Sequence, residues 1–238
     1  MFRFLLMIIP LAIHTFIDYI IIGLYTRKNP YGEMNNRLMR NWCKLILNMC
    51  GIKLISEGLE HVITDHSCII LANHQSAFDI PVIGFLINAT VRFMAKKEIF
   101  QIPILGSAMK GAGIFIVDRQ NRTQAIESIK KAIQLLQQNT IAIVGFPEGT
   151  RTPDGQVHDF KKGLFMMALD SGVPILPVSI SGADKRAKKK SINIRPGPIK
   201  VVVHPPVDVT RYGNANRDQL IKDVRDIIIS QVDPNFGG

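Results

Sequence analysis

Two side chains that could act as a base and an orienting acid lie close together in the first third of the chain. His74 and Asp79 are five positions apart, and on a regular helix they would point about 140° apart, so a turn must bring them together. The apolar run 67–72 predicts a strand and the run 78–86 a helix, and the junction between them supplies that turn. There the carboxylate of Asp79 can accept the Nδ1 proton of His74 and leave Nε2 free to take a proton from a hydroxyl. The pair is therefore a candidate general base with its orienting partner.

Ser76 stands between these two residues and raises a second interpretation, a Ser-His-Asp triad. It lies only two positions from His74, and the sequence lacks the G-x-S-x-G pattern that exposes a nucleophilic serine. The simpler interpretation of Ser76 is a hydroxyl in the first turn of a helix. The sequence also has no H-E-x-x-H motif or carboxylate cluster, so no metal is expected.

A second block can hold an anion. Phe146 through Arg151 spell F-P-E-G-T-R at the end of the apolar run 141–146, where α/β sheets place ligand-binding groups. Gly149 lets backbone amides approach a ligand closely, and Arg151 offers a planar guanidinium suited to phosphate. Glu148 would repel a phosphate unless it binds a free hydroxyl or braces the arginines. The alternative is an ordinary surface Glu-Gly turn.

Two further positions add candidate cations. Arg119 follows the apolar run 113–117 at a predicted strand end, and Lys97 follows the run 91–95 as a weaker candidate. The block V-P-I-L-P at 173–177 has no ionisable group, and its two prolines stiffen the entry to a buried strand. Core packing is the favoured interpretation of that block, and the wall of a hydrocarbon groove is the alternative.

The pattern beyond Gly51 alternates short β-branched runs with helical stretches, which predicts an α/β sheet with helices packed on it. The clearest predicted helices are 123–138 and 214–231, each with apolar residues at helical spacing on one face. The predicted strands are 67–72, 91–95, 113–117, 141–146, 175–180 and 199–204.

Length, charge and cysteine content narrow the class of protein. The 238 residues suffice for one catalytic domain with an appendage. A formal net charge of +10 favours an anionic partner, but aromatic residues make up only 7% and are not interleaved with basic ones, so nucleic acid is not expected. Three cysteines without C-x-x-C spacing indicate neither a disulfide framework nor a zinc site, and they fit a reducing, cytosol-facing location.

The chain divides into a front segment and a main domain. Residues 1–50 are predicted to form membrane-anchoring helices, and residues 51–238 a catalytic domain that includes the last helix. The stretch 38–55 has the composition of an amphipathic helix, which rests either on lipid headgroups or on the core of the domain.

The front segment begins with an apolar run from 4 to 25. As a helix it would reach about 33 Å, long enough to cross a bilayer, and the basic residues after it favour a cytoplasmic location for the domain. His14 and Asp18 lie on one helical face of this run, and the cost of a carboxylate in hydrocarbon favours a helix that lies partly in the interface. A cleaved signal peptide is disfavoured because the run is too long.

The strongest local charge bias is the run 185–190, which has five Lys or Arg in six residues. It is predicted to lie in a loop before the last strand. A solvated loop is the simpler interpretation. The functional one is contact with anionic lipid, at on the order of 1 kcal/mol per charge.

Four blocks in a fixed order resemble the glycerolipid acyltransferases, and most closely the bacterial 1-acylglycerol-3-phosphate acyltransferases. The blocks are N-H-x-x-x-x-D at 73–79, G-x-x-x-V-D-R at 113–119, F-P-E-G-T-R at 146–151 and V-P-I-L-P at 173–177. The resemblance extends over about residues 52–203. It implies a mixed, largely parallel sheet flanked by helices.

The resemblance also implies a function. A membrane-bound enzyme of this kind moves a fatty acyl group from acyl-coenzyme A (acyl-CoA) or acyl carrier protein (acyl-ACP) to the free hydroxyl of lysophosphatidic acid, giving phosphatidic acid. The resemblance implies no cofactor beyond that acyl donor. It also implies that the protein is bound to the anionic surface of a membrane, in bacteria the inner membrane, with the catalytic domain on the cytoplasmic face. The alternatives are transfer to another lysolipid or to glycerol phosphate, and an inactive basic module that binds membrane surfaces.

Site residues follow from the resemblance position by position. His74 and Asp79 match the catalytic pair. The acceptor-binding and phosphate-binding blocks are matched by Arg119, Glu148, Gly149, Thr150 and Arg151. Lys97 matches a basic position of the family only loosely.

Overall fold

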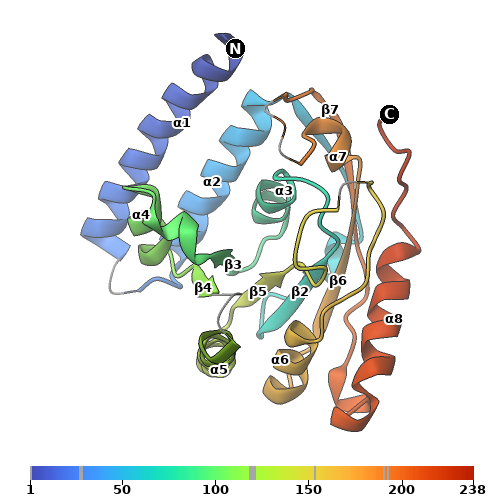
Figure 1. Cartoon of the computed structure of the whole chain (residues 1–238). Coiled ribbons are helices and arrows are strands. Elements are labelled where there is room, and N and C mark those ends of the chain that lie inside the picture. The colour runs from blue at the N-terminus through green and yellow to red at the C-terminus, as the bar shows by residue number, and fades with distance from the viewer. Residues whose placement is uncertain (1, 27–28, 118–121, 153, 190, 192) are drawn as a thin grey trace.

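A seven-stranded sheet with helices on both faces forms the centre of the molecule (Figure 1). The structure is a computed structural model that describes residues 2–26, 29–117, 122–152, 154–189, 191 and 193–238. The strands are β1 (Ile52–Glu57), β2 (Cys68–Ala72), β3 (Val91–Lys96), β4 (Phe115–Val117), β5 (Ala142–Gly145), β6 (Ile175–Ser181) and β7 (Gly197–Val203). The α-helices are α1 (Phe2–Ile21), α2 (Glu33–Met49), α3 (Asp79–Leu86), α4 (Leu105–Gly111), α5 (Arg122–Gln138), α6 (Gly163–Ser171), α7 (Ala183–Arg186) and α8 (Arg217–Ile229). Single turns of other helix types are η1 (Ile22–Thr26), η2 (Leu59–His61), η3 (Lys97–Gln101), η4 (Val209–Arg211) and η5 (Asn214–Asn216).

The strand order places the His74–Asp79 turn and the F-P-E-G-T-R block at one edge of the sheet. The order is β1-β7-β6-β2-β5-β3-β4, and every neighbouring pair is parallel except β6 with β7. The predicted α/β sheet and its largely parallel character are therefore confirmed. Because β6, β2, β5, β3 and β4 run in the same direction, their carboxyl ends meet at one edge, where such sheets bind ligands.

Alternation along β2 shows how the two layers of helices are held. Cys68 and Ile70 pack into the apolar cluster on the α2 and α3 face, whereas Ile69 and Leu71 pack with α5, α6 and α8 on the other face. All four side chains are buried. A strand that is apolar on both faces in this way belongs in the middle of a parallel sheet, which fixes the position of the residues that follow it.

The expected helix over 38–55 is wrong in its second part. Helix α2 ends at Met49, Gly51 adopts a left-handed φ of +65°, and β1 begins at Ile52. Residues 52–57 pair in parallel with β7 from the far end of the chain. This distant pairing decides their conformation, and a local pattern does not show it.

The apolar run 4–25 forms α1 as far as Ile21 and then the π-type turn η1. Among the residues that the structure describes, none of the helices combines the length and the apolar character needed to cross a bilayer. His14 and Asp18 share one face of α1 as predicted, with Nδ1 2.9 Å from Oδ2. Burial raises the pKa of Asp18, and the contact with His14 opposes that rise.

Helices α1 and α2 lie side by side and are tied to the main domain (Figure 1). The indole N–H of Trp42 in α2 donates to the hydroxyl of Thr15 in α1 at 2.9 Å. Arg92 of β3, 1% exposed, donates to the side-chain oxygen of Asn36 at 2.8 Å and to the carbonyl of Pro30 at 2.5 Å. Burial lowers the pKa of Arg92 to about 10, so its guanidinium stays charged at neutral pH. The front helices are thus fixed against the sheet.

Candidate active site

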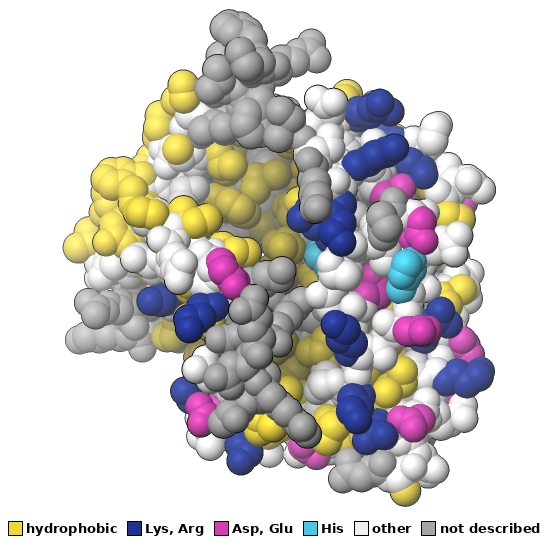
Figure 2. All heavy atoms as spheres, in the orientation of Figure 1, with side chains coloured by type: hydrophobic (Ala, Val, Ile, Leu, Met, Phe, Trp, Pro, Cys, Tyr) yellow, Lys and Arg dark blue, Asp and Glu magenta, His cyan; other side chains and the backbone are white. Residues whose placement is uncertain are grey.

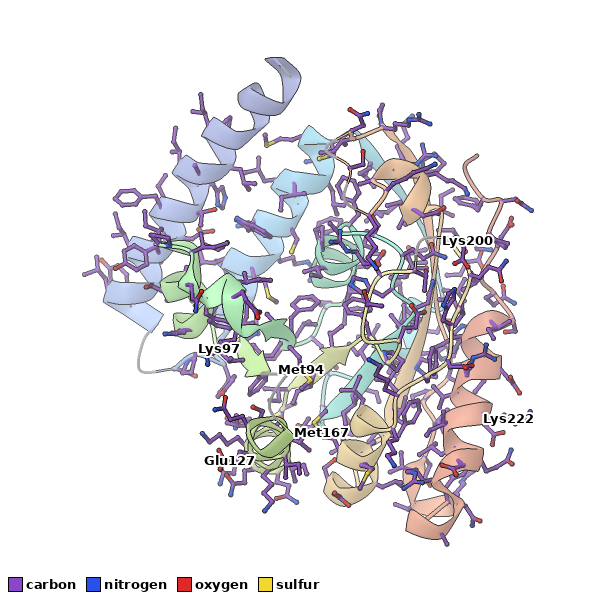
Figure 3. The ribbon with its side chains drawn as sticks, viewed as in Figure 1. Met94, Lys97, Glu127, Met167, Lys200 and Lys222 are labelled. Atoms are coloured by element: carbon purple, nitrogen blue, oxygen red, sulfur yellow. The ribbon has the colours of Figure 1, made fainter. Side chains whose placement is uncertain are left out.

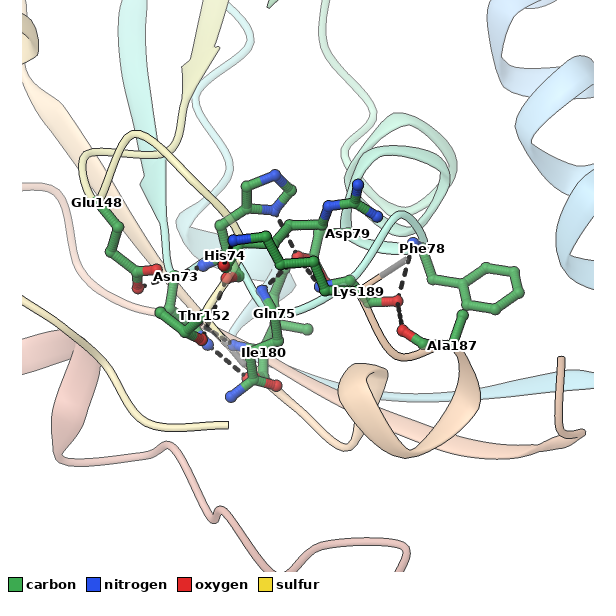
Figure 4. Close-up of polar contacts among 12 residues, drawn as sticks. Asn73, His74, Gln75, Phe78, Asp79, Glu148, Thr152, Ile180, Ala187 and Lys189 are labelled. Atoms are coloured by element: carbon green, nitrogen blue, oxygen red, sulfur yellow. Dashed lines mark hydrogen bonds and ion pairs between the residues drawn. The ribbon is translucent and has the colours of Figure 1, made fainter. Parts of the chain in front are cut away.

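The turn after β2 brings the predicted catalytic pair together. The Nδ1 of His74 lies 2.7 Å from Oδ2 of Asp79, the first residue of α3 (Figure 4). The same oxygen accepts the backbone N–H groups of Gln75 at 2.7 Å and Ser76 at 2.8 Å. Because an ionised carboxylate only accepts hydrogen bonds, Nδ1 carries the proton and Nε2 is left with its lone pair. The predicted turn is confirmed, and its geometry suits a general base.

The F-P-E-G-T-R block holds the catalytic turn from the other side. The ring of Phe146, directly after β5, stacks on the imidazole of His74 with centroids 4.1 Å apart and planes 17° apart. The backbone N–H of Thr152 donates to the carbonyl of His74 at 2.8 Å. These contacts form because β5 pairs with β2, so that the ends of the two strands are neighbours. The stacking by Phe146 was not predicted, although the block begins with that aromatic residue.

Glu148 is directed at the backbone of the catalytic turn. Its Oε1 accepts the backbone N–H of His74 at 3.3 Å, and the residue is 5% exposed. Burial raises the pKa of Glu148 to about 8, and the hydrogen bond from His74 opposes that rise. The carboxyl is therefore protonated over much of the neutral range. Binding of an acceptor by Glu148 stays a prediction.

Neighbouring side chains fix the turn at both ends. The side-chain amide of Asn73 donates to the carbonyl of Ile180 and accepts its N–H, both at 2.8 Å, which joins the end of β2 to β6. The hydroxyl of Ser76 donates to the carbonyl of Ala187 at 2.8 Å. Ser76 thus has a structural partner in the described chain that differs from the base a triad requires.

A cavity of about 540 Å³ opens beside His74. His74 shares it with Gly149, Thr150 and Arg151, so the predicted base and the predicted phosphate ligand face one space. Gly149 has a φ of +77°, and a Cβ there would lie 2.9 Å from Nζ of Lys161, so glycine suits this turn. Figure 2 shows basic side chains along one rim of an apolar hollow.

The remaining wall of the cavity is mostly apolar. It comes from α1 and α2 together with β3, α4 and the turns around them. Met94 of β3 lies on this wall, and Asp18 and Asn35 are polar members of it (Figure 3). Representative apolar side chains of the wall are Ile22, Leu38, Met39, Trp42, Leu105 and Met109.

Two of the other predicted positions, Lys97 and the block 173–177, lie outside the described lining of the cavity. Lys97 begins η3, is exposed and lies beside α4 (Figure 3); it is outside the set of described residues that line the cavity. Arg119 lies outside the described residues. The block 173–177 leads into β6 at the opposite edge of the sheet, where Ile175 and Leu176 are fully buried, so core packing is confirmed for it.

Neither a metal site nor a cofactor site was predicted. Within the described parts of the chain, His, Cys, Asp and Glu side chains form no group of three that could hold a metal ion.

Known proteins are similar to this chain in sequence and in fold. The model of the acyltransferase family matches residues 53–181. A 1-acyl-sn-glycerol-3-phosphate acyltransferase from Limnanthes alba is 32% identical over 78% of this chain and 65% of its own length. The enzyme of that name from Borreliella burgdorferi is 30% identical over 82% of this chain and 78% of its own length. The chain therefore spans slightly less than two thirds of the plant relative and more of the bacterial one.

A solved structure agrees with these matches. The crystal structure of the 1-acyl-sn-glycerophosphate acyltransferase from Thermotoga maritima has a TM-score of 0.67 and 30% sequence identity, over 94% of this chain and 95% of that one. The family match covers more than half of the chain and includes both the catalytic turn and the F-P-E-G-T-R block that hold the cavity. On these grounds of sequence, fold and site geometry, the chain belongs to the acyltransferase family.

Proposed function

We propose that the chain transfers a fatty acyl group from acyl-CoA or acyl-ACP to the free hydroxyl of lysophosphatidic acid, which makes phosphatidic acid. One observation carries the proposal: the imidazole of His74, oriented by Asp79, and the guanidinium-bearing Arg151 line the same cavity. The relatives named above for this reaction support the choice of acceptor. An acceptor with a phosphate at one end and a free hydroxyl near it fits this pair of groups, because the guanidinium can bind the phosphate and the imidazole can take the hydroxyl proton.

The proposed reaction uses His74 as the base while Arg151 binds the phosphate. Nε2 of His74 takes the proton of the acceptor hydroxyl while its oxygen attacks the thioester carbonyl. The new C–O bond forms, the C–S bond breaks, and the imidazolium returns the proton to the departing thiolate. Asp79 stabilises the imidazolium through the hydrogen bond to Nδ1. The apolar wall of the cavity suits the hydrocarbon chain that the substrates carry.

A panel of acceptors tests this assignment. We expect purified chain with acyl-CoA to release thiol with lysophosphatidic acid at a kcat/KM at least about tenfold above that with monoacylglycerol, because a charge-assisted phosphate contact contributes roughly 1.5–3 kcal/mol. Glycerol 3-phosphate and lysophosphatidylcholine complete the panel. Arg151→Ala is the matched variant and should reduce the preference, mainly through the acceptor KM. Thiol release without any acylated lipid product, or equal rates with and without the phosphate, would contradict the proposal.

We also propose that α1 attaches the protein to the cytoplasmic surface of a membrane. Apolar side chains of α1 and η1 are exposed at helical spacing: Ile13 at 56%, Phe16 at 47%, Ile20 at 42% and Leu24 at 71%. Figure 2 shows hydrophobic side chains gathered on the side of the molecule where Figure 1 places α1. An apolar helix face beside basic side chains suits insertion into the headgroup region of anionic lipid.

Vesicle binding tests the attachment. Replacing Phe16 and Ile20 together with glutamate should weaken co-sedimentation with anionic phospholipid vesicles at least about tenfold, because each buried apolar side chain contributes roughly 1.5–3 kcal/mol. Ile229→Glu is the control, since Ile229 is 38% exposed at the end of α8, across the sheet from α1. Equal loss of binding in the control, or none in the double variant, would exclude α1 as the contact surface.

A further inference from the structure

The basic run 185–190 places one of its lysines in the active-site cavity. The run follows β6, whose carboxyl end lies at the same sheet edge as that of β2. Its first residues form α7, so the predicted loop begins with a helical turn. Lys189 is half-buried and lines the cavity together with His74 and Arg151, whereas Lys188 is exposed. Lys189 lies outside all four sequence blocks that predicted the site.

Hydrogen bonds hold Lys189 in this position. Its Nζ donates to the hydroxyl of Thr150 at 3.1 Å and to the carbonyl of Arg151 at 2.9 Å. The segment is also attached to the catalytic turn by the Ser76 hydroxyl, which donates to the carbonyl of Ala187. Figure 4 shows Lys189 lying across the catalytic turn near His74. The ammonium is therefore held on the cavity wall beside Thr150 and Arg151.

The charges around Lys189 favour an anion. An ammonium has three N–H donors, and the two protein oxygens use two of them. Among the residues with described positions, no carboxylate lies within ion-pair distance of Lys189 or of Arg151. Two cations without a carboxylate partner on one cavity wall attract a multiply charged ligand.

We infer that Lys189 is a further substrate-binding residue whose ammonium contacts phosphoryl oxygens beside Arg151. The inference rests on the proposed acyl transfer and extends its acceptor site by a residue from a separate segment. The phosphate can come from the acceptor or from the acyl donor, since both carry one. Lys189 holds the ligand and takes no proton from it.

Kinetics of Lys189→Gln against Lys188→Gln test the inference, because both variants remove one positive charge from the same segment. With lysophosphatidic acid varied at saturating acyl-CoA, Lys189→Gln should raise the acceptor KM about tenfold with kcat little changed, and Lys188→Gln should match the wild type. Lys189→Arg should recover part of the affinity. A rise confined to the KM of acyl-CoA would instead assign the contact to the phosphate of the donor.

Two results would overturn the inference. One is that the two glutamine variants have equal KM values for both substrates, which would mean that only the overall charge of the segment affects binding. The other is a fall in kcat with both KM values unchanged, which would reduce Lys189 to a brace for Thr150 and Arg151.

A binding measurement separates this inference from the proposed function. Trp42 is the one tryptophan of the sequence and lines the cavity, so its fluorescence reports occupancy without turnover. Lys189→Gln should weaken binding of lysophosphatidic acid about tenfold and leave that of monoacylglycerol unchanged. The wild-type chain could bind lysophosphatidic acid tightly and in a phosphate-dependent way and yet acylate none of the acceptors. That result would contradict the proposed reaction, and a loss of this binding in Lys189→Gln would still support the role of Lys189.

Discussion

The His74→Ala variant is expected to lose acyl transfer, with kcat reduced by about 10²- to 10⁴-fold and the KM values little changed. The imidazole removes the hydroxyl proton only while the C–O bond forms, so its loss raises the barrier without removing the contacts that bind substrate. Asp79 cannot take over, because it is fully buried and its Oδ2 still accepts the N–H groups of Gln75 and Ser76. Thiol release in single-turnover and steady-state assays measures the effect.

Folding of the variant is checked separately. Alanine at position 74 loses the stacking on Phe146, worth about 1 kcal/mol, so the thermal midpoint should fall by only a few degrees. Ser76→Ala is the control, since Ser76 lies in the same turn and its hydroxyl bonds to Ala187. It should keep a kcat within a few-fold of the wild type. An active His74→Ala variant would contradict the role of His74 as the base. A folded but inactive Ser76→Ala variant would instead favour the Ser-His-Asp triad.

Local sequence patterns predicted the parts of the site that one turn can build. The five-residue spacing of His74 and Asp79 required a strand-to-helix turn, and the structure has it between β2 and α3. The same reasoning placed Arg151 after a buried strand. These predictions succeeded because a strand end, a glycine turn and a helix start are determined by neighbouring residues.

The sequence could not show which strands are neighbours. Pairing of β2 with β5 and β6 is what places Phe146 on His74 and brings Lys189 to the cavity. The segments involved are separated by about 70 to 115 residues, and no periodicity within either one encodes the contact. The edge strand β1 was missed for the same reason, because its partner β7 lies near the other end of the chain.

The expected role of Glu148 shows how such a contact changes an interpretation. As one residue of a glycine-rich turn it suggested a ligand for the acceptor hydroxyl. In the fold, Glu148 follows β5 and its carboxyl group packs against the turn that carries His74. There it accepts the backbone N–H of His74 and is shielded from water. Burial at this position shifts the titration of the Glu148 carboxyl, which the sequence alone did not indicate.

Glu148→Gln is expected to make the protein more stable at pH 8 and to have little effect at pH 4. Burial raises the pKa of Glu148 to about 8, whereas in the unfolded chain it is close to 4.5. Between these values the folded state holds a proton that the unfolded state releases, so wild-type stability falls as pH rises, by up to about 1.4 kcal/mol per pH unit. Glutamine is neutral at every pH and keeps an oxygen that can accept the His74 N–H. The advantage of the variant should therefore grow to on the order of 2–4 kcal/mol by pH 8.

Urea denaturation of both proteins between pH 4 and pH 8 measures this difference directly. Glu148→Ala serves as the matched variant: it also removes the titration, but it leaves the N–H of His74 without its acceptor, so it should be less stable than Glu148→Gln at every pH by about 1–3 kcal/mol. Parallel stability curves for wild type and Glu148→Gln would mean that the carboxyl titrates near its ordinary pKa and reaches water. A water-exposed carboxylate beside the cavity would in turn favour the acceptor-binding role for Glu148 over the backbone contact, so the same curves decide between the two.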